Sequence, residues 1–387
     1  MTPTACTLCA SAQTTEFITI PSFPIHCNML WPTKAGAQGA NRGDITLAFC
    51  HQCGHIFNTS FDPALMSYTQ DYENSLHFSS RFQTYATGLA EHLIARYGLH
   101  GKKIVEIGAG QGDFLRMLCE MGGNEGVGFD PSYVPEPDFD DLNGRLSFIQ
   151  AYYNDAHANH PADFITCRHV FEHIESPDAF LGMVRRIIGQ RQKIVTFFEV
   201  PNMAFTLRQH AIWDIIYEHC SYFTPQSLRH VFTRNGFRPL DMRETFGQQF
   251  LTIEAEPVST ALTAPDLTDL IAAVAAFAQH YRQKVAHWQQ ALAKIKKTGK
   301  TAVVWGAGSK GVSFLNTLPT QDVIRTVIDI NPRKHGMFVA GAGQQIVPPS
   351  FLKTAPPDIV ILMNPNYQQE IGQTLHNLNL HPQIMVA

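Results

Sequence analysis

Short apolar segments alternate with longer segments of mixed polarity along the middle of the chain. The apolar segments lie at residues 103–106, 126–130, 147–150, 164–167 and 194–198. The stretches between them are long enough for helices, and such alternation is typical of βαβ units with parallel strands. We therefore predict an α/β domain built on a parallel sheet.

The pattern differs on both sides of this domain. Residues 1–60 are interrupted by proline, glycine and cysteine and contain strand-like pieces such as 45–49, which predicts a small, loop-rich module. Apolar residues recur at helical spacing over 68–97 and again over 266–297, where neither glycine nor proline intervenes. The second of these stretches predicts one long linking helix.

A second set of strand-like segments follows the linking helix. It lies at residues 301–305, 326–330 and 358–363 and predicts a smaller Rossmann-like domain. A chain of 387 residues is too long for one ordinary core. The expected parts are a module at 1–65, an α/β domain at 66–260, a linking helix at 261–299 and a Rossmann-like domain at 300–387.

Composition limits the partners of this protein. Its net charge is −4 and no run of lysine and arginine occurs, so the sequence lacks the electrostatic footprint of nucleic-acid binding. The first residues lack a basic stretch followed by an apolar one, and no apolar run approaches the roughly 18 residues of a membrane span. We expect a cytoplasmic protein with a small-molecule substrate, and neither a nucleic acid nor a membrane as partner.

Three glycines at alternate positions follow the first strand of the central domain. Gly108, Gly110 and Gly112 precede an apolar helix start, and such glycines let the backbone turn tightly and approach a ligand closely. Glu106 lies two residues before them, and Asp130 ends the next strand, where an acid can bind ribose hydroxyls. This arrangement resembles motif I of class I S-adenosylmethionine (SAM) methyltransferases more than a dinucleotide site.

The carboxyl ends of the other strands should complete this SAM site, because ligands of open α/β sheets lie outside those ends. Ala151 follows the third strand and is expected beside the adenine. Arg168 and His169 follow the fourth strand and are expected at the methionine end. His169 and the nearby His173 are equally open to a structural interpretation, as satisfied histidines at a helix start.

Two Cys-x-x-Cys pairs lie near the N-terminus, formed by Cys6 with Cys9 and by Cys50 with Cys53. Two residues between thiolates let both sulfurs converge on one ion, and two such pairs complete a tetrahedral zinc site. A site closed by four cysteines would be structural, because catalytic zinc normally keeps an open position. Other side chains could replace a ligand, namely Cys27, His51 and His55.

Acid–base side chains are densest at residues 213–223. Methyl transfer to carbon or to a hydroxyl requires removal of a proton, and His219 suits this role because the unperturbed pKa of histidine lies near the operating pH. Glu218 could fix the tautomer of His219, and Tyr217 and Tyr222 could donate hydrogen bonds to a developing enolate oxygen. The alternative is a helix-to-strand turn whose aromatic side chains belong to the core.

A second glycine motif, Gly-x-Gly-x-x-Gly, begins the C-terminal domain. Its glycines are Gly306, Gly308 and Gly311. Asp329 ends the following strand, which by itself indicates NAD. Lys310 within the turn and Lys334 beyond Asp329 add positive charge near the same edge. These groups fit a nucleoside diphosphate attached to a substrate as well as a dinucleotide.

Together these motifs resemble the nucleotide-sugar C-methyltransferases, which act on 4-keto-deoxysugars. The resemblance covers essentially the whole chain, from the cysteine pairs to the C-terminal glycine motif and the residues that follow it. It implies an N-terminal zinc-binding domain, a central SAM-binding domain and a C-terminal Rossmann-like domain that helps to bind the nucleotide sugar. It also implies that His219 takes the proton at C3, beside the C4 ketone, and that the enolate then attacks the methyl group.

The resemblance has one departure and one extension. The leading Tyr-His of the family's Tyr-His-Glu-His motif falls on Ile216 and Tyr217, so either Tyr217 takes over a role at the sugar or the chain methylates a different ketone or hydroxyl. Tyr68 and Tyr72 lie where the family places a tyrosine-rich lid over the SAM pocket.

Two other functions fit the sequence. An O- or N-methyltransferase of a small metabolite would not exchange a carbon-bound proton. A protein with zinc and nucleotide sites but no chemistry would bind SAM without turnover.

Overall fold

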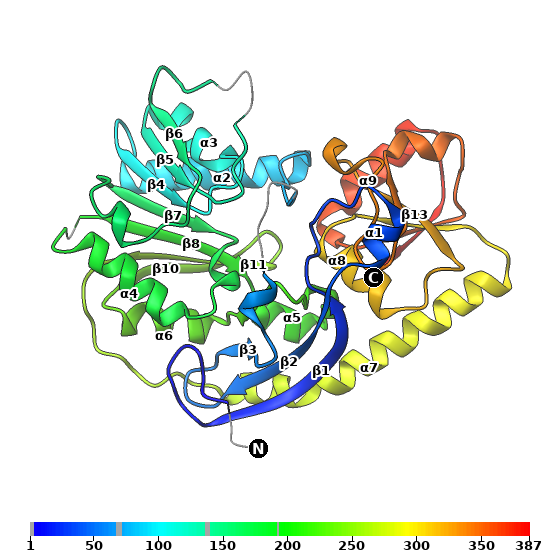
Figure 1. The fold of residues 1–387 in the computed structure, drawn as a ribbon, viewed down its shortest axis with the longest axis horizontal. Helices are drawn as coiled ribbons and strands as arrows, with labels where there is room; N and C mark the ends of the chain where they lie inside the picture. Colours follow the sequence, from blue (N-terminus) through cyan, green and yellow to red (C-terminus); the bar gives the residue numbers. More distant parts are fainter. Residues whose placement is uncertain (1–3, 67–71, 136–139, 192) are drawn as a thin grey trace.

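The computed structural model describes residues 4–66, 72–135, 140–191 and 193–387. Figure 1 shows a central α/β domain, an N-terminal sheet beneath it, and a C-terminal α/β domain reached by a long helix. Within these residues, no helix combines the length and apolar character needed to cross a membrane.

The central sheet has the strand order β10-β11-β8-β7-β4-β5-β6. β11 is antiparallel to its neighbours, and the strands from β8 to β6 are parallel. The chain proceeds from β4 to β6 on one side and returns to β7 on the other, so the strand order reverses at the end of β4, where open α/β sheets bind ligands. The strands are β4 (Lys103–Ile107), β5 (Glu125–Phe129), β6 (Leu146–Ile149), β7 (Phe164–Arg168), β8 (Val195–Pro201), β10 (Arg238–Thr245) and β11 (Phe250–Glu256).

Helices cover both faces of this sheet, which confirms the predicted α/β class. Leu93 of α2 and Leu118 of α3 belong to the core on one face, and Leu181 of α4 and Val231 of α6 belong to the core on the other. The helices of this domain are α2 (Ser80–Tyr97), α3 (Asp113–Gly122), α4 (Pro177–Ile188), α5 (Met203–Gln209) and α6 (Pro225–Arg234).

The helix predicted over residues 68–97 begins later, at Ser80. Ser79 caps it, because its side chain accepts a hydrogen bond from the Phe82 N–H. Glu370 of the C-terminal domain in turn accepts hydrogen bonds from the Ser79 hydroxyl at 2.6 Å and the Ser80 N–H at 3.0 Å. The Ser79 cap is a local signal for this start, whereas the added contact with Glu370 is not contained in the local pattern. The beginning of the predicted helix, with Tyr68, lies outside the described residues.

The N-terminal module is a sheet with two long strands joined by irregular segments, and the predicted strand piece at 45–49 lies within the longer β2. Its order is β1-β2-β3-β9, and all its pairs are antiparallel. Bulges between Glu16 and Ile18 and between Ile20 and Phe23 let β1 continue past Pro21. The fourth strand comes from the central region of the sequence. The elements are β1 (Thr14–Pro24), α1 (Lys34–Gln38), β2 (Arg42–Cys50), β3 (Ile56–Asn58) and β9 (Ser221–Tyr222).

The long linking helix is confirmed as α7 (Thr268–Lys297). In Figure 1 it runs beneath the N-terminal sheet to the C-terminal domain, and Phe277 and Trp288 lie in a core shared with both. The C-terminal sheet is parallel, with the order β14-β13-β12-β15-β16, which gives the predicted Rossmann-like arrangement. Its elements are β12 (Ala302–Trp305), α8 (Ser309–Thr317), β13 (Ile324–Ile328), β14 (Gln345–Val347), β15 (Ile359–Leu362), α9 (Gln368–Asn377) and β16 (Gln383–Val386).

Candidate active site

The glycine turn after β4 leaves an open approach at its centre. Gly108, Gly110 and Gly112 have φ angles of 70°, 56° and 87°, a region that L side chains rarely adopt. A Cβ atom on Gly108 would lie 2.1 Å from a methyl group of Val170, and one on Gly112 would lie 2.0 Å from the ring of Phe148. A Cβ on Gly110 would meet no atom within 4 Å. A ligand can therefore approach the backbone at Gly110.

Two acids flank this turn. The Asp130 carboxylate accepts hydrogen bonds from the Gly110 N–H at 2.8 Å and from the hydroxyl of Ser132 at 2.6 Å, and its oxygens keep further lone pairs for a ribose. Glu106 is buried, and its Oε2 has no hydrogen-bond partner among the described residues. Burial raises the pKa of Glu106 to about 8. The turn, the acid beside it and the unpartnered carboxyl fit a SAM molecule, whose ammonium group would supply the missing partner.

A buried network lies at the ends of β7 and β8. Arg168 donates to Oε1 of Glu199 at 2.8 and 3.1 Å, the Nε2 of His169 lies 2.9 Å from the same oxygen, and the Tyr85 hydroxyl donates to Oε2. Burial opposes the charge of Glu199, but Arg168 and then His169 hold its pKa at about 2. The backbone of His169 is left-handed, with a φ of 55°. The network thus fixes His169 at the predicted edge of the sheet.

His219 lies within a group of acid–base side chains. The ring centroids of His173 and His219 are 4.9 Å apart, and potential ligand atoms of Glu172, His173 and His219 lie within 4.8 Å of one another. Burial, with His173 and His169 nearby, holds the pKa of His219 well below its usual range. The imidazole of His219 is therefore neutral at physiological pH, the form that accepts a proton.

The side chain of Glu218 contacts the N-terminal module. Glu218 is fully buried, its Oε1 lies 3.4 Å from Nδ1 of His26, and its Oε2 accepts a hydrogen bond from the Cys27 N–H at 3.3 Å. Its main-chain carbonyl accepts a hydrogen bond from Nδ1 of His173 at 3.0 Å. The connection from Glu218 to the histidine group thus runs through the backbone, whereas the prediction assigned it to the carboxylate.

The two predicted oxyanion donors are engaged elsewhere. Tyr217 is fully buried and its hydroxyl accepts a hydrogen bond from the Asp62 N–H at 3.0 Å. The Tyr222 hydroxyl donates to the Ile216 carbonyl at 2.8 Å and accepts from the Ile216 N–H at 3.2 Å. The structure brings His219 together with His173 and Glu172, and leaves both tyrosine hydroxyls in the core. Both rings are buried, and a buried tyrosine hydroxyl needs a hydrogen-bond partner, which each of the two finds within the protein core.

Tyr72 and Ala151 lie at the periphery of the site. The Tyr72 hydroxyl accepts a hydrogen bond from the Asn28 side chain at 3.4 Å. The chain then passes the start of α3, where the Ser75 hydroxyl lies 3.4 Å from the Asp113 carboxylate, beside the glycine turn. Ala151 follows β6 at the same edge of the sheet as Asp130, and its contact with the adenine stays a prediction.

The C-terminal glycine turn repeats the design of the first. Asp329 accepts a hydrogen bond from the Ala307 N–H at 2.8 Å, just as Asp130 accepts one from Gly110. A Cβ on Gly311 would lie 2.0 Å from the carbonyl oxygen of Gly306, so this glycine is needed for the turn itself. Gly308 is the N-cap of α8. Because glycine has no side chain to cap the helix, the amide N–H groups at the helix start remain for an anion.

The two lysines differ from their predicted arrangement around a diphosphate. The Lys310 ammonium donates to Asp214, in the short 3-10 helix η4 (Ile212–Asp214) of the central domain. Lys334 is buried, and its ammonium donates to the Ala307 carbonyl at 3.3 Å. Both charges are therefore used to join elements of the protein, because burial of an ammonium group requires a partner.

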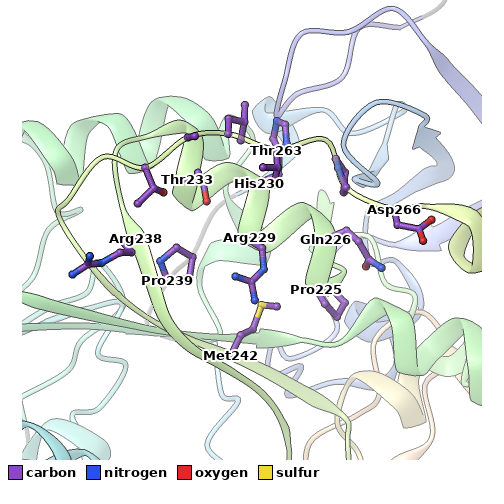
Figure 2. A pocket seen from close by; sticks show the side chains of 14 residues that line it. Pro225, Gln226, Arg229, His230, Thr233, Arg238, Pro239, Met242, Thr263 and Asp266 are labelled. Carbon is purple, nitrogen blue, oxygen red and sulfur yellow. The ribbon is translucent and has the colours of Figure 1, made fainter.

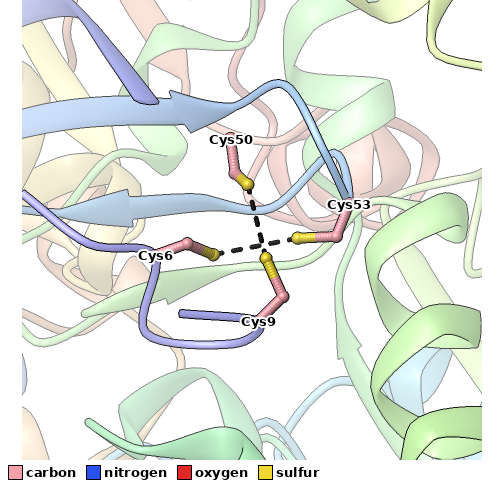
Figure 3. A group of neighbouring side chains, drawn as sticks. All are labelled: Cys6, Cys9, Cys50 and Cys53. Carbon is pink, nitrogen blue, oxygen red and sulfur yellow. Dashed lines mark hydrogen bonds between the residues drawn. The ribbon is translucent and has the colours of Figure 1, made fainter. Parts of the chain in front are cut away.

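Among the described residues, the four cysteines of the two pairs gather at the predicted metal site (Figure 3). Their sulfurs lie 3.7 Å apart between Cys6 and Cys53 and 3.6 Å apart between Cys9 and Cys50. A tetrahedral zinc ion with Zn–S bonds of about 2.3 Å places its sulfurs about 3.8 Å apart, so the spacing fits zinc. The alternative ligands lie elsewhere: Cys27 beside Glu218, His51 beside Thr15, and His55 between Phe57 and Phe223.

Several residues of the site were not predicted. They are His26, Tyr85, Glu199 and Asp214. Glu199 had one usable signal, because it is an acid that directly follows the apolar segment at 194–198. The others come from separate elements, and nothing in their local sequence indicates their partners.

A separate cavity of about 540 Å³ lies between α6, the start of β10 and the segment at 260–266 (Figure 2). Arg229, His230 and Arg238 line it, and none of the predicted site residues does. The candidate active site is instead defined by the glycine turn and the histidine group.

Comparisons with known proteins agree with this assignment. Residues 81–241 match the family described as "Methyltransferase domain", and residues 262–382 match the family described as "C-methyltransferase C-terminal domain". The C-methyltransferase NovU of Streptomyces niveus is 25% identical over 303 residues, covering 73% of this chain and 71% of NovU.

Parts of solved structures are similar as well. One is the N,N-8-amino-8-demethyl-D-riboflavin dimethyltransferase of Streptomyces davawensis, with 16% identity and a TM-score of 0.36, covering 46% of this chain and 54% of that one. Another is the magnesium protoporphyrin IX methyltransferase of Synechocystis PCC 6803 with bound SAH, with 15% identity and a TM-score of 0.36, covering 48% and 89%.

The family matches and the glycine turn define the class: this chain is a SAM-dependent methyltransferase. More particularly, residues 262–382 match a C-methyltransferase C-terminal domain, and the chain is similar to the C-methyltransferase NovU.

Substitutions in the glycine turn test the SAM site directly. We expect Gly110→Val to abolish SAM binding measured by calorimetry, because the side chain would fill the open approach. Asp130→Ala is expected to weaken binding by about 1–3 kcal/mol, the cost of a lost buried hydrogen bond. Gly123→Val is the matched control, since Gly123 also has a positive φ of 65° and open space but lies at the other end of α3. Unchanged binding in the first two variants would place SAM elsewhere.

Proposed function

We propose that this enzyme transfers a methyl group to the carbon beside the ketone of a nucleotide-linked keto-deoxysugar. SAM supplies the methyl group as an electrophile, so the protein has to generate and align the nucleophile. His219 removes the proton from the carbon and the resulting enolate is the nucleophile. The observation that carries this proposal is the histidine group itself, in which the half-buried His219 lies within reach of His173 and Glu172.

The choice of carbon and of a nucleotide sugar rests on two further observations. The relative NovU and the second family match are C-methyltransferases by description. The amide groups at the start of α8, with Asp329 beside them, form a place for a diphosphate and a ribose outside the SAM site. We also propose one structural zinc ion at the four cysteines.

The product and the exchange of the substrate proton test this function. With a panel of nucleotide sugars, thermal shifts identify a ligand, because binding to the native state raises its stability. We expect NMR of the product to show a new methyl group on carbon, and solvent deuterium to enter the substrate carbon in the presence of wild-type enzyme. A methyl group on oxygen or nitrogen, without such exchange, would refute the proposed reaction.

The pH dependence of catalysis follows from the environment of His219. Because burial lowers its pKa, the base form persists below the usual histidine range, and protonation removes activity only at more acidic pH. We expect the acidic limb of kcat to lie well below pH 6.5 in a pH-rate profile. A limb at or above pH 6.5 would contradict the assignment of His219 as a base with a lowered pKa.

A further inference from the structure

The segment that carries His219 is docked onto the C-terminal domain. We call residues 212–219 the base segment. Near its start, the Trp213 ring packs edge-on against Phe314 of α8, with centroids 5.1 Å apart, and Phe314 packs against Trp288 of α7 at 5.0 Å. All three side chains are buried. The start of the base segment thus belongs to the core of the linking helix and the C-terminal domain.

An ion pair joins the same two elements at the C-terminal glycine turn. Lys310 lies inside the turn and donates to Asp214, and the side chains of both residues are about one-fifth exposed. Asp214 is five residues from His219 along the base segment. The lysine that a diphosphate would approach at the start of α8 is therefore attached directly to the segment that holds the base.

The rest of the base segment is held mainly by the N-terminal module. Tyr222 of β9 holds both backbone groups of Ile216, and the Asp62 N–H holds Tyr217. The Glu218 carboxylate is held by the Cys27 N–H and its carbonyl by His173. Among these contacts only that from His173 comes from the central sheet region that holds the SAM turn. The base segment therefore depends on the C-terminal domain and the N-terminal module for its position.

We propose that Lys310 and Asp214 are positioning residues that hold the base segment against the C-terminal domain and thereby align His219. This inference rests on the proposed function, in which His219 is the base. The Lys310–Asp214 pair links the C-terminal glycine turn to the base segment. Binding of a substrate diphosphate at the start of α8 and alignment of His219 therefore involve the same lysine. The ion pair acts on the alignment of His219, and SAM binding does not depend on it.

Kinetics of charge variants test this role. We expect Asp214→Asn and Lys310→Met to lower kcat by about 10- to 100-fold, the range expected for small misplacement of a reacting group, with SAM affinity unchanged. The double variant with exchanged charges, Asp214→Lys and Lys310→Asp, is expected to recover part of the loss. Lys296→Met is the matched control, because Lys296 forms a 2.6 Å ion pair with Asp322 on the surface of the same half of the chain. Its kcat should equal that of the wild type.

Hydrogen–deuterium exchange supplies a readout that is independent of catalysis. Peptides covering residues 212–220 should exchange faster in Asp214→Asn than in the wild type. Their exchange in Lys296→Met should equal that of the wild type. Unchanged kcat and unchanged exchange in Asp214→Asn, or an equal loss in Lys296→Met, would overturn the inference. If the proposed reaction is wrong, NMR of the product shows the methyl group on an atom other than carbon. The rate of hydrogen–deuterium exchange in the base segment still reports on the ion pair in that case.

Discussion

Replacement of His219 by asparagine is expected to reduce kcat by about 10² to 10⁴-fold, the usual contribution of a general base. The affinity for SAM should change little, because the imidazole acts on the substrate proton in the transition state and lies in a segment separate from the glycine turn. The incorporation of solvent deuterium into the substrate carbon should also disappear. Calorimetry and single-turnover kinetics measure these quantities separately.

The neighbouring histidine provides a control for this variant. The Nε2 of His169 lies 2.9 Å from Glu199, and we expect His169 at the methionine end of SAM, so His169→Asn should affect SAM binding more than proton exchange. Full activity in His219→Asn would refute the role of His219. Loss of deuterium exchange in His169→Asn alone would transfer that role to His169.

Cys50→Ser is expected to release the metal and to destabilise the whole chain. Apparent binding free energies of structural zinc sites are about 10–16 kcal/mol, and that energy contributes to folding. Cys50 and Cys53 also belong to the core that contains Phe57 and Phe223, which lie on either side of His55. We therefore expect zinc content measured by metal analysis to fall from one to near zero per chain, with a lower unfolding temperature and reduced activity.

The matched control is a cysteine outside the cluster. Cys119 is fully buried in α3 and is absent from the group of four sulfurs, so Cys119→Ser should keep one zinc per chain even if it lowers stability. A Cys50→Ser protein that retains both zinc and stability would contradict the proposed site. A wild-type protein with near-zero zinc would do the same.

Local sequence determined the parts of this protein whose physical requirements span a few residues. Alternating strand and helix patterns predicted the parallel strands of both α/β domains and the long helix α7, because apolar periodicity follows directly from which faces are buried. The antiparallel strands β10 and β11 of the central sheet were not predicted. Gly110 was identified because a tight turn with a positive φ and an open approach requires glycine. The spacing within each cysteine pair likewise contains the geometry of half a metal site.

Tertiary structure alone decided which side chains meet. Tyr217, Lys310 and Glu218 have the chemistry predicted for a catalytic or binding role, yet their polar groups contact Asp62, Asp214 and the N-terminal module. The direction of each is set by burial and by partners from distant elements, which local sequence does not contain. The strand β9 shows the same effect, since Ser221 and Tyr222, just past the base segment, complete the N-terminal sheet. The sequence thus specified the chemistry available to this methyltransferase, and packing between its domains selected which groups face the site.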